Sequence, residues 1–66
     1  MKIRNFTKPE LDMFRENCNF TDEELQVFEL LSKDKTIIYI SMELNFSESK
    51  VSKLIRRVKD KIIKVL

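Results

Sequence analysis

Residues 36–62 read TIIYISMELNFSESKVSKLIRRVKDKI, which is an apolar segment, a polar break and a longer basic segment. Residues at helical spacing in the first segment predict a short helix over 36–44: Ile37, Ile40, Ser41 and Leu44. The break is Asn45-Phe46-Ser47, and Ser47 is a favoured N-cap residue. A second helix is therefore expected from residue 48 to about residue 63.

A short helix, a three-residue turn and a longer basic helix describe a helix-turn-helix unit. Such a unit needs a small residue where its helices cross, and Ser41 supplies one. Phe46 is expected to fill the space beneath the turn, and Val51, Leu54 and Ile55 to form the inner face of the second helix. The opposite face of that helix is then free to enter a DNA major groove.

The first half of the chain carries two further helix starts. Thr7 with Glu10 and Thr21 with Glu24 both have the spacing of a capping box, so helices are predicted over 8–17 and from residue 22 to about residue 31. Residues 32–35 form the intervening turn, where Asp34 tolerates the left-handed backbone conformation. We therefore expect one all-α domain over residues 1–66, with four helices and a helix-turn-helix motif.

The residue inventory excludes most catalytic chemistry. The 66 residues include no His, no Gly and a single Cys. A catalytic triad, a structural zinc site, a glycine-rich phosphate loop and a disulfide framework are each short of the residues they need. We expect no enzyme activity, no catalytic or metal-binding residue and no cofactor. The lone Cys18 is expected in the core.

Charge is divided unevenly along the chain. Residues 1–34 contain five basic and eight acidic side chains, a net charge of −3, whereas residues 35–66 contain eight basic and three acidic ones, a net charge of +5. A basic half indicates a polyanionic partner, although a solvated basic helix face accounts for the same pattern. No apolar run approaches the length of about 20 residues that a membrane helix needs, so a cytoplasmic protein without a membrane partner is expected.

Residues 20–62 resemble the LuxR/GerE-type DNA-binding domain and, more distantly, region 4 of bacterial sigma factors. The resemblance rests on FTDEELQVFELLSKDKT from residue 20, on Ile40-Ser41-Met42-Glu43-Leu44, and on FSESKVSKLIRRVKDKI from residue 46. It extends over this stretch without a gap. The resemblance implies a bacterial or phage regulator of transcription that binds double-stranded DNA and is associated with the nucleoid.

Carried over position by position, the resemblance assigns eight DNA-binding residues. It places Lys50, Ser52 and Lys53 in the major groove with Ser49 at its margin, and Arg56 and Arg57 near phosphates. Ser47 and Thr36 stand at helix starts and would offer backbone N–H groups to the DNA backbone.

The sequence departs from the family pattern at several points. The family has Thr at the position of Lys50 and Lys at the position of Ser52, so the basic and the hydroxyl residue have changed places. Leu54 is apolar where the family has a polar residue. The family's further dimerisation helix has no counterpart in residues 1–66, and the helix over 8–17 is additional.

A second hypothesis is a sigma-like or phage-type adaptor that binds RNA polymerase or another protein instead of DNA. Four short helices bury less apolar surface than the chain offers, which indicates a partner or self-association unless the N-terminal segment covers the excess. The surplus residues are Ile38, Tyr39, Met42, Ile63, Val65 and Leu66. A homodimer would use either the N-terminal helix or the C-terminal cluster Ile62, Ile63, Val65 and Leu66.

Overall fold

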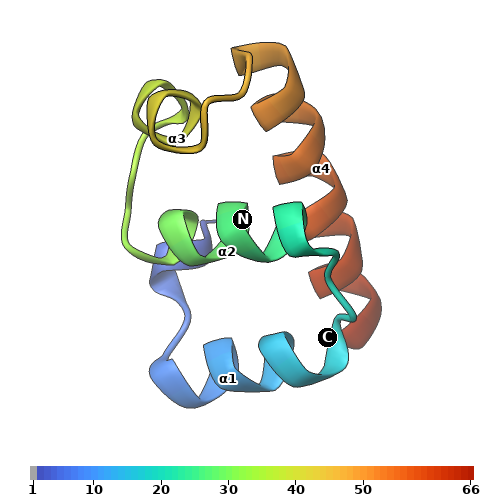
Figure 1. Cartoon of the computed structure of the whole chain (residues 1–66). Coiled ribbons are helices and arrows are strands. Elements are labelled where there is room, and N and C mark those ends of the chain that lie inside the picture. The colour runs from blue at the N-terminus through green and yellow to red at the C-terminus, as the bar shows by residue number, and fades with distance from the viewer. Residues whose placement is uncertain (1) are drawn as a thin grey trace.

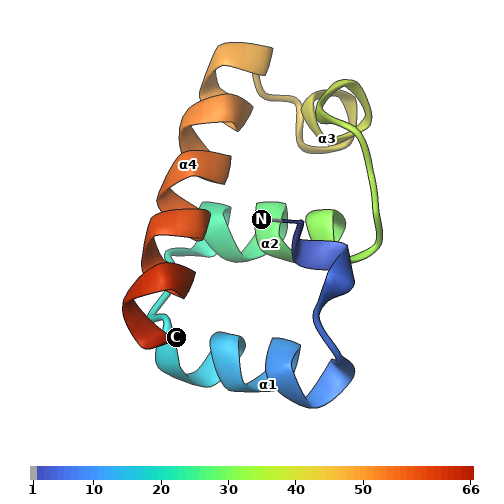
Figure 2. The ribbon, with the colours of Figure 1, turned by 180° about the vertical axis from the view of Figure 1, so that it is seen from behind.

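The computed structural model describes residues 2–66 and is all-helical over that range (Figure 1). A short 3-10 helix, η1 (Ile3–Asn5), precedes the four α-helices, which are α1 (Lys8–Asn17), α2 (Asp22–Ser32), α3 (Ile37–Leu44) and α4 (Glu48–Val65). The 18 residues of α4 correspond to a length of about 27 Å. This is close to the long dimension of the molecule, 29 Å. Helix α4 therefore runs beside the other three (Figures 1 and 2).

Both capping boxes predicted from the sequence are present. The Thr7 hydroxyl accepts a hydrogen bond from the Glu10 backbone N–H, and the Glu10 carboxylate accepts one from the Thr7 backbone N–H at 2.9 Å. Thr21 and Glu24 make the same reciprocal pair at the start of α2, with distances of 3.2 and 3.0 Å. These bonds satisfy first-turn N–H groups that have no partner within the helix, which fixes where α1 and α2 begin.

Three non-glycine residues at positive φ reverse the chain between helices, at Asn19 (54°), Asp34 (63°) and Asn45 (59°). The left-handed conformation predicted for Asp34 is confirmed. After α2, the Lys35 N–H donates to the Leu30 carbonyl at 3.1 Å and the Asp34 N–H to the Leu31 carbonyl at 3.0 Å. This is the Schellman pattern, in which orphan carbonyls at a helix end are satisfied by the reversing chain. Asn and Asp thus take the role that Gly often fills.

Two buried clusters hold the helices together. The first lies between η1, α1, α2 and the C-terminal half of α4, and comprises Ile3, Phe14, Cys18, Phe28, Val58 and Ile62. The second lies between α2, α3 and the N-terminal half of α4, and comprises Val27, Ile40, Val51 and Leu54. Because α4 contributes to both clusters, its position and rotation are fixed along its length.

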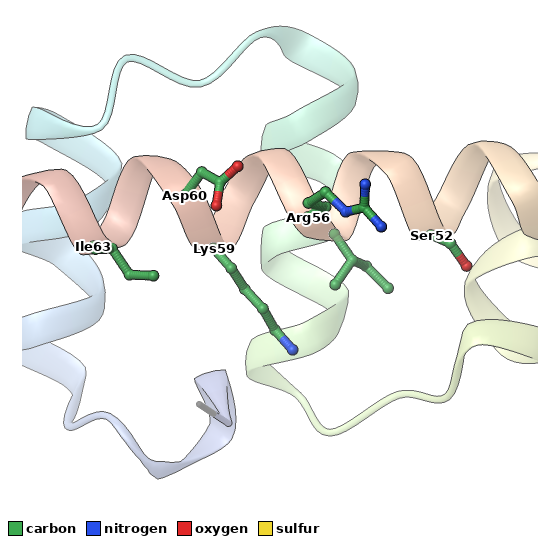
Figure 3. Close-up of a pocket in the computed structure, with 6 residues that line it drawn as sticks. Ser52, Arg56, Lys59, Asp60 and Ile63 are labelled. Carbon is green, nitrogen blue, oxygen red and sulfur yellow. The ribbon is translucent and has the colours of Figure 1, made fainter.

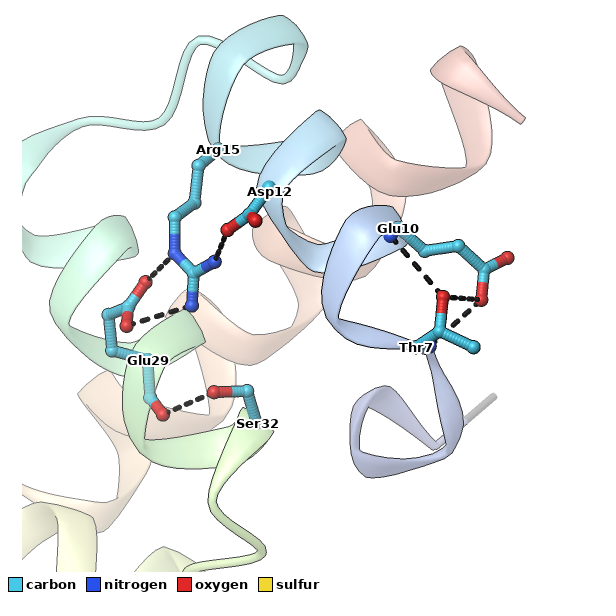
Figure 4. A network of polar contacts seen from close by, with 6 residues as sticks. All are labelled: Thr7, Glu10, Asp12, Arg15, Glu29 and Ser32. Carbon is cyan, nitrogen blue, oxygen red and sulfur yellow. Dashed lines mark hydrogen bonds and ion pairs between the residues drawn. The ribbon is translucent and has the colours of Figure 1, made fainter.

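The guanidinium of Arg15 links α1 to α2. Arg15 on α1 donates through Nη2 to a carboxylate oxygen of Glu29 on α2 at 3.0 Å and through Nη1 to Asp12 at 2.6 Å (Figure 4). Its guanidinium also lies 5.5 Å from the centre of the Phe28 ring. The hydrogen bond to Glu29 is the main reason that the pKa of Arg15 is raised.

The bounds predicted for α1 are confirmed, α2, α3 and α4 each differ from the prediction by one or two residues at one end, and η1 was not predicted. Helix α2 continues through Ser32, and α4 ends two residues beyond residue 63. Ile37, expected on the inner face of α3, is exposed, and Ile40 is the one fully buried residue of that helix. Cys18 is buried, as expected. Within residues 2–66, no helix combines the length and the apolar character needed to cross a membrane.

Candidate nucleic-acid interface

The connection between α3 and α4 has the local geometry expected of a tight turn. Asn45 adopts the left-handed conformation, and the Phe46 N–H donates to the Ser41 carbonyl at 3.0 Å. The side chain of Phe46 is half-buried against the second core cluster, as predicted. Ser47 caps α4, its hydroxyl accepting from the Lys50 N–H at 3.1 Å. This turn sets the N-terminal half of α4 beside α3.

All eight residues predicted to bind DNA are exposed in the structure, and they are distributed over three sides of this region. The buried stripe of α4 is Val51, Leu54, Val58 and Ile62. A rotation of about 100° per residue places Ser49, Lys53 and Arg56 on the side opposite to this stripe. We call these three residues the outer face. Lys50 and Arg57 lie on one flank of α4 and Ser52 on the other.

The flank that carries Lys50 faces the acidic start of α2. The Lys50 ammonium donates to a carboxylate oxygen of Glu23 at 2.8 Å and lies 4.1 Å from the centre of the Phe46 ring. Further along the same flank, Lys61 binds the Glu24 carboxylate and the Asn19 carbonyl. Lys50 and Lys61 are therefore engaged within the molecule, and their partners stand 27 and 37 residues away in the sequence.

Glu24 is the one buried charged side chain among the described residues, with 3% of its surface exposed. Burial acts to raise the pKa of its carboxyl, but the hydrogen bonds from Lys61 and from the Thr21 backbone, together with the positive charges of Lys61 and Arg57, outweigh that effect and lower the pKa. Glu24 is therefore held ionised at neutral pH, and Arg57 contributes to its electrostatic environment. Along this flank, acidic side chains of α2 and basic side chains of α4 therefore partly neutralise each other.

The outer face, by contrast, keeps its positive charges unpaired. Within residues 2–66, neither Lys53 nor Arg56 forms an ion pair with an acidic side chain. Among the acidic residues of α4, Asp60 lies on this face one turn beyond Arg56, and Glu48 lies in the first turn on the flank that carries Ser52. Lys64 in the last turn of α4 is exposed as well and forms no ion pair within residues 2–66, so unpaired positive charge lies on both sides of Asp60 along the helix.

The other flank of α4 borders an open hollow of about 430 Å³ (Figure 3). Its lining residues all come from α4 and are Ser52, Ile55, Arg56, Lys59, Asp60 and Ile63. In Figure 3, Lys59 and Ile63 point to the same side of the helix. Lys59 was not among the predicted binding residues, although it lies four residues from both Ile55 and Ile63 and therefore on the same side of the helix.

Thr36 and Ser47 are the N-cap residues of α3 and α4. The Thr36 hydroxyl accepts a hydrogen bond from the Tyr39 N–H at 3.1 Å, and the Ser47 hydroxyl accepts one from the Lys50 N–H at 3.1 Å. Each side chain therefore caps the helix that follows it.

Helix α3 exposes most of its apolar surface, including Ile38 at 62% and Met42 at 77%. Tyr39 is exposed as well, with the Lys35 ammonium 4.8 Å from its ring centre. The N-terminal segment therefore does not cover these residues.

The predicted C-terminal cluster is divided between core and surface. Ile62 is fully buried in the first core cluster, and Val65 packs against it. Of the four residues, Ile63 and Leu66 are largely exposed, at 59% and 70%, so a dimer through the C-terminal cluster would rest on these two side chains.

The described residues show no group of three or more Cys, Asp or Glu side chains arranged to hold a metal ion. Burial raises the pKa of the Cys18 thiol, which makes this side chain an unreactive member of the core. Comparison of the chain with protein-family models, with curated proteins and with solved structures found no match.

Proposed function

We propose that this chain is a DNA-binding regulator of transcription in which α3, the turn and α4 act as a helix-turn-helix. Helix α4 would lie in the major groove with its N-terminal half against the bases, and the partner would be double-stranded DNA. The proposal describes a binding protein without enzymatic activity, acting in the cytoplasm at the nucleoid.

The observation that supports the proposal most strongly is the unpaired positive charge on the outer face. A lysine and an arginine project from the side of α4 opposite to its buried stripe, while Lys50 and Lys61 on the α2-facing flank are paired with Glu23 and Glu24. Lys and Arg at such positions are the residues that read guanine or bind phosphates. Because α4 is packed into both core clusters, these side chains project from a rigid support.

The geometry supports different roles for the predicted residues. Ser49, Lys53 and Arg56 are proposed to meet base edges, and Arg57 to bind a phosphate at one side of the groove. Ser52 would contact the opposite side. Lys50 is proposed to hold the turn against α2 and to reach DNA only when its bond to Glu23 opens. Thr36 and Ser47 contribute through the first backbone N–H groups of α3 and α4.

The test is a titration of the protein onto duplex DNA with a double variant, Lys53→Gln with Arg56→Gln. Its matched control is Lys2→Gln with Lys8→Gln, which removes the same net charge from the other half of the chain. Loss of the outer-face pair should weaken binding by about 1–3 kcal/mol or more, and the control by much less. Equal losses in the two variants would refute the assignment of the outer face.

The exposed apolar side of α3 favours one other function, an adaptor that contacts RNA polymerase. Ile38, Tyr39 and Met42 form an apolar surface of the kind found at protein interfaces. Under this alternative, Met42→Asp would abolish capture of RNA polymerase by the immobilised chain, and the outer-face double variant would not. The DNA-binding proposal expects neither variant to alter such a capture.

A further inference from the structure

The outer face of α4 presents hydrogen-bond donors in its N-terminal half. Lys53 and Arg56 are both exposed there, three residues apart, and neither forms an ion pair within residues 2–66. An ammonium and a guanidinium only donate hydrogen bonds, because neither group has an acceptor. The first acidic side chain on this face is Asp60, one turn beyond Arg56. This part of α4 is therefore matched by a partner that presents hydrogen-bond acceptors.

Guanine is the base whose major-groove edge consists of acceptors alone. It carries two of them, N7 and O6, and no donor. Adenine has one acceptor beside a donor, cytosine has a donor, and thymine has one acceptor beside a methyl group. A side chain that only donates thus forms two hydrogen bonds with guanine and fewer with any other base.

The spacing of the two cations corresponds to neighbouring base pairs. The rise along α4 from Lys53 to Arg56 is about 4.5 Å, and they are separated by about 60° around the helix axis, so both point into the same groove. Successive base pairs are separated by about 3.4 Å. In a helix that lies in the major groove, residues about one turn apart contact successive bases, as zinc-finger helices do. Ser49, one turn before Lys53, would meet a third base pair, where its hydroxyl accepts or donates.

The packing of α4 limits the readout to these two cations. The Lys50 ammonium is held by Glu23 at 2.8 Å, so the other cation of the first turn is engaged within the molecule. Val51 and Leu54 are buried in the second core cluster, which fixes the rotation of the helix in this region. The outer-face cations therefore leave α4 in a fixed direction, which contact with a particular base edge requires.

We infer that α4 recognises two adjacent guanines on one strand of the duplex, one through Lys53 and the other through Arg56. The inference rests on the proposed function and adds the base sequence that this surface selects. On DNA that lacks such a step, the same cations contact phosphates, and binding is weaker and independent of sequence.

Competition between short duplexes tests the inference. The reference duplex has one pair of adjacent guanines at its centre within a background of A·T pairs, and the comparison duplex has two adenines in their place. At about 200 mM salt, the chain should bind the reference duplex at least about tenfold more tightly. Replacing both guanines with 7-deazaguanine, which lacks the N7 acceptor, should remove most of this preference. Replacing them with inosine, which lacks only the minor-groove amino group, should leave it intact.

Single substitutions test the roles of the two cations. A glutamine side chain pairs with N6 and N7 of adenine, so Lys53→Gln and Arg56→Gln should each move the preference at one of the two positions from guanine to adenine. Lys8→Gln is the matched control, because it removes the same charge from an exposed position on α1, and it should keep the preference for both guanines. Circular dichroism establishes that the three variants keep their helix content.

The outcomes separate this inference from the proposed function. Salt-dependent binding of equal affinity to both duplexes would overturn the inference and leave the DNA-binding proposal standing. An equal loss with inosine and 7-deazaguanine, or a guanine preference that both outer-face variants retain, would also overturn it. Absence of binding to either duplex at about 50 mM salt would overturn the proposed function, and the inference with it.

Discussion

Two lysines three residues apart on α4 should contribute very differently to DNA binding. The Lys50 ammonium is held 2.8 Å from Glu23, whereas Lys53 on the outer face forms no ion pair among the described residues. We predict that Lys53→Gln weakens binding substantially and that Lys50→Gln has a smaller effect. The two variants have the same net charge, the same residue types and the same helix, so they form a matched pair.

The magnitude follows from the release of counterions by phosphate contacts. Each phosphate contact contributes about −0.9 to the slope of log K against log salt concentration, which is a factor of about 3.5 between 50 and 200 mM salt. Each of the unpaired cations Lys53, Arg56 and Arg57 is taken to neutralise one phosphate charge, including the two that are proposed to meet base edges, which gives a slope of about −2.7 per bound chain. Lys53→Gln should reduce it to about −1.8, and Lys50→Gln should leave it near −2.7.

The assay is fluorescence anisotropy of a labelled duplex titrated with each variant at several salt concentrations. The ion pair between Lys50 and Glu23 has both side chains nearly half exposed, so it contributes only about 0–1 kcal/mol to stability and opens readily. Glu23→Gln should therefore strengthen DNA binding by at most a few fold. If Lys50→Gln reduced the slope as much as Lys53→Gln, the reasoning from intramolecular pairing would be refuted.

Three further predictions concern stability and the border of the outer face. Glu24→Gln should lower the stability by about 1–2 kcal/mol at pH 7, because the charge-assisted bond from Lys61 is lost while Lys61 stays partly hydrated. Since folding lowers the pKa of Glu24, this stabilisation is complete above the unfolded carboxyl pKa of about 4.3 and disappears as the pH falls through the folded value, so urea melts of the two proteins should converge in acid. Asn45→Ala should cost about 1 kcal/mol in thermal melts and Asn45→Gly close to none, because φ at this position is positive; an equal loss for both would contradict a backbone cause. Asp60→Asn should raise the affinity for duplex DNA a few fold by removing the negative charge that borders the outer face, and a decrease would mean that this part of α4 does not face phosphates.

Local signals in the sequence were sufficient to predict where the four α-helices begin and end to within one or two residues. A capping box such as Thr21 with Glu24 depends on residues three apart, and the left-handed turn at Asp34 depends on its own side chain, so neither needs knowledge of the tertiary structure. The buried stripe of α4 follows from periodicity in the same way. The 3-10 helix at Ile3–Asn5 gave no such signal, since three residues are too few for a period.

The pairing of charges across the molecule was not predictable from the sequence. Glu24 reads as a capping residue, and nothing local indicates that it also binds Lys61, 37 positions away. The same is true of Lys50, which the family pattern placed in the groove and which the structure holds against Glu23. Tertiary packing decides which cations of a basic helix form ion pairs, and helical spacing alone cannot separate the paired cations from the unpaired ones.

Binding to a duplex of random sequence at about 50 and 200 mM salt is the most direct measurement of the proposed function. The three unpaired cations, Lys53 and Arg56 on the outer face and Arg57 on the flank, predict an affinity that falls about 40-fold per bound chain between these two conditions. Absence of binding by folded protein at the lower salt concentration, or binding that does not change with salt, would contradict the proposal that α4 carries a DNA-binding surface.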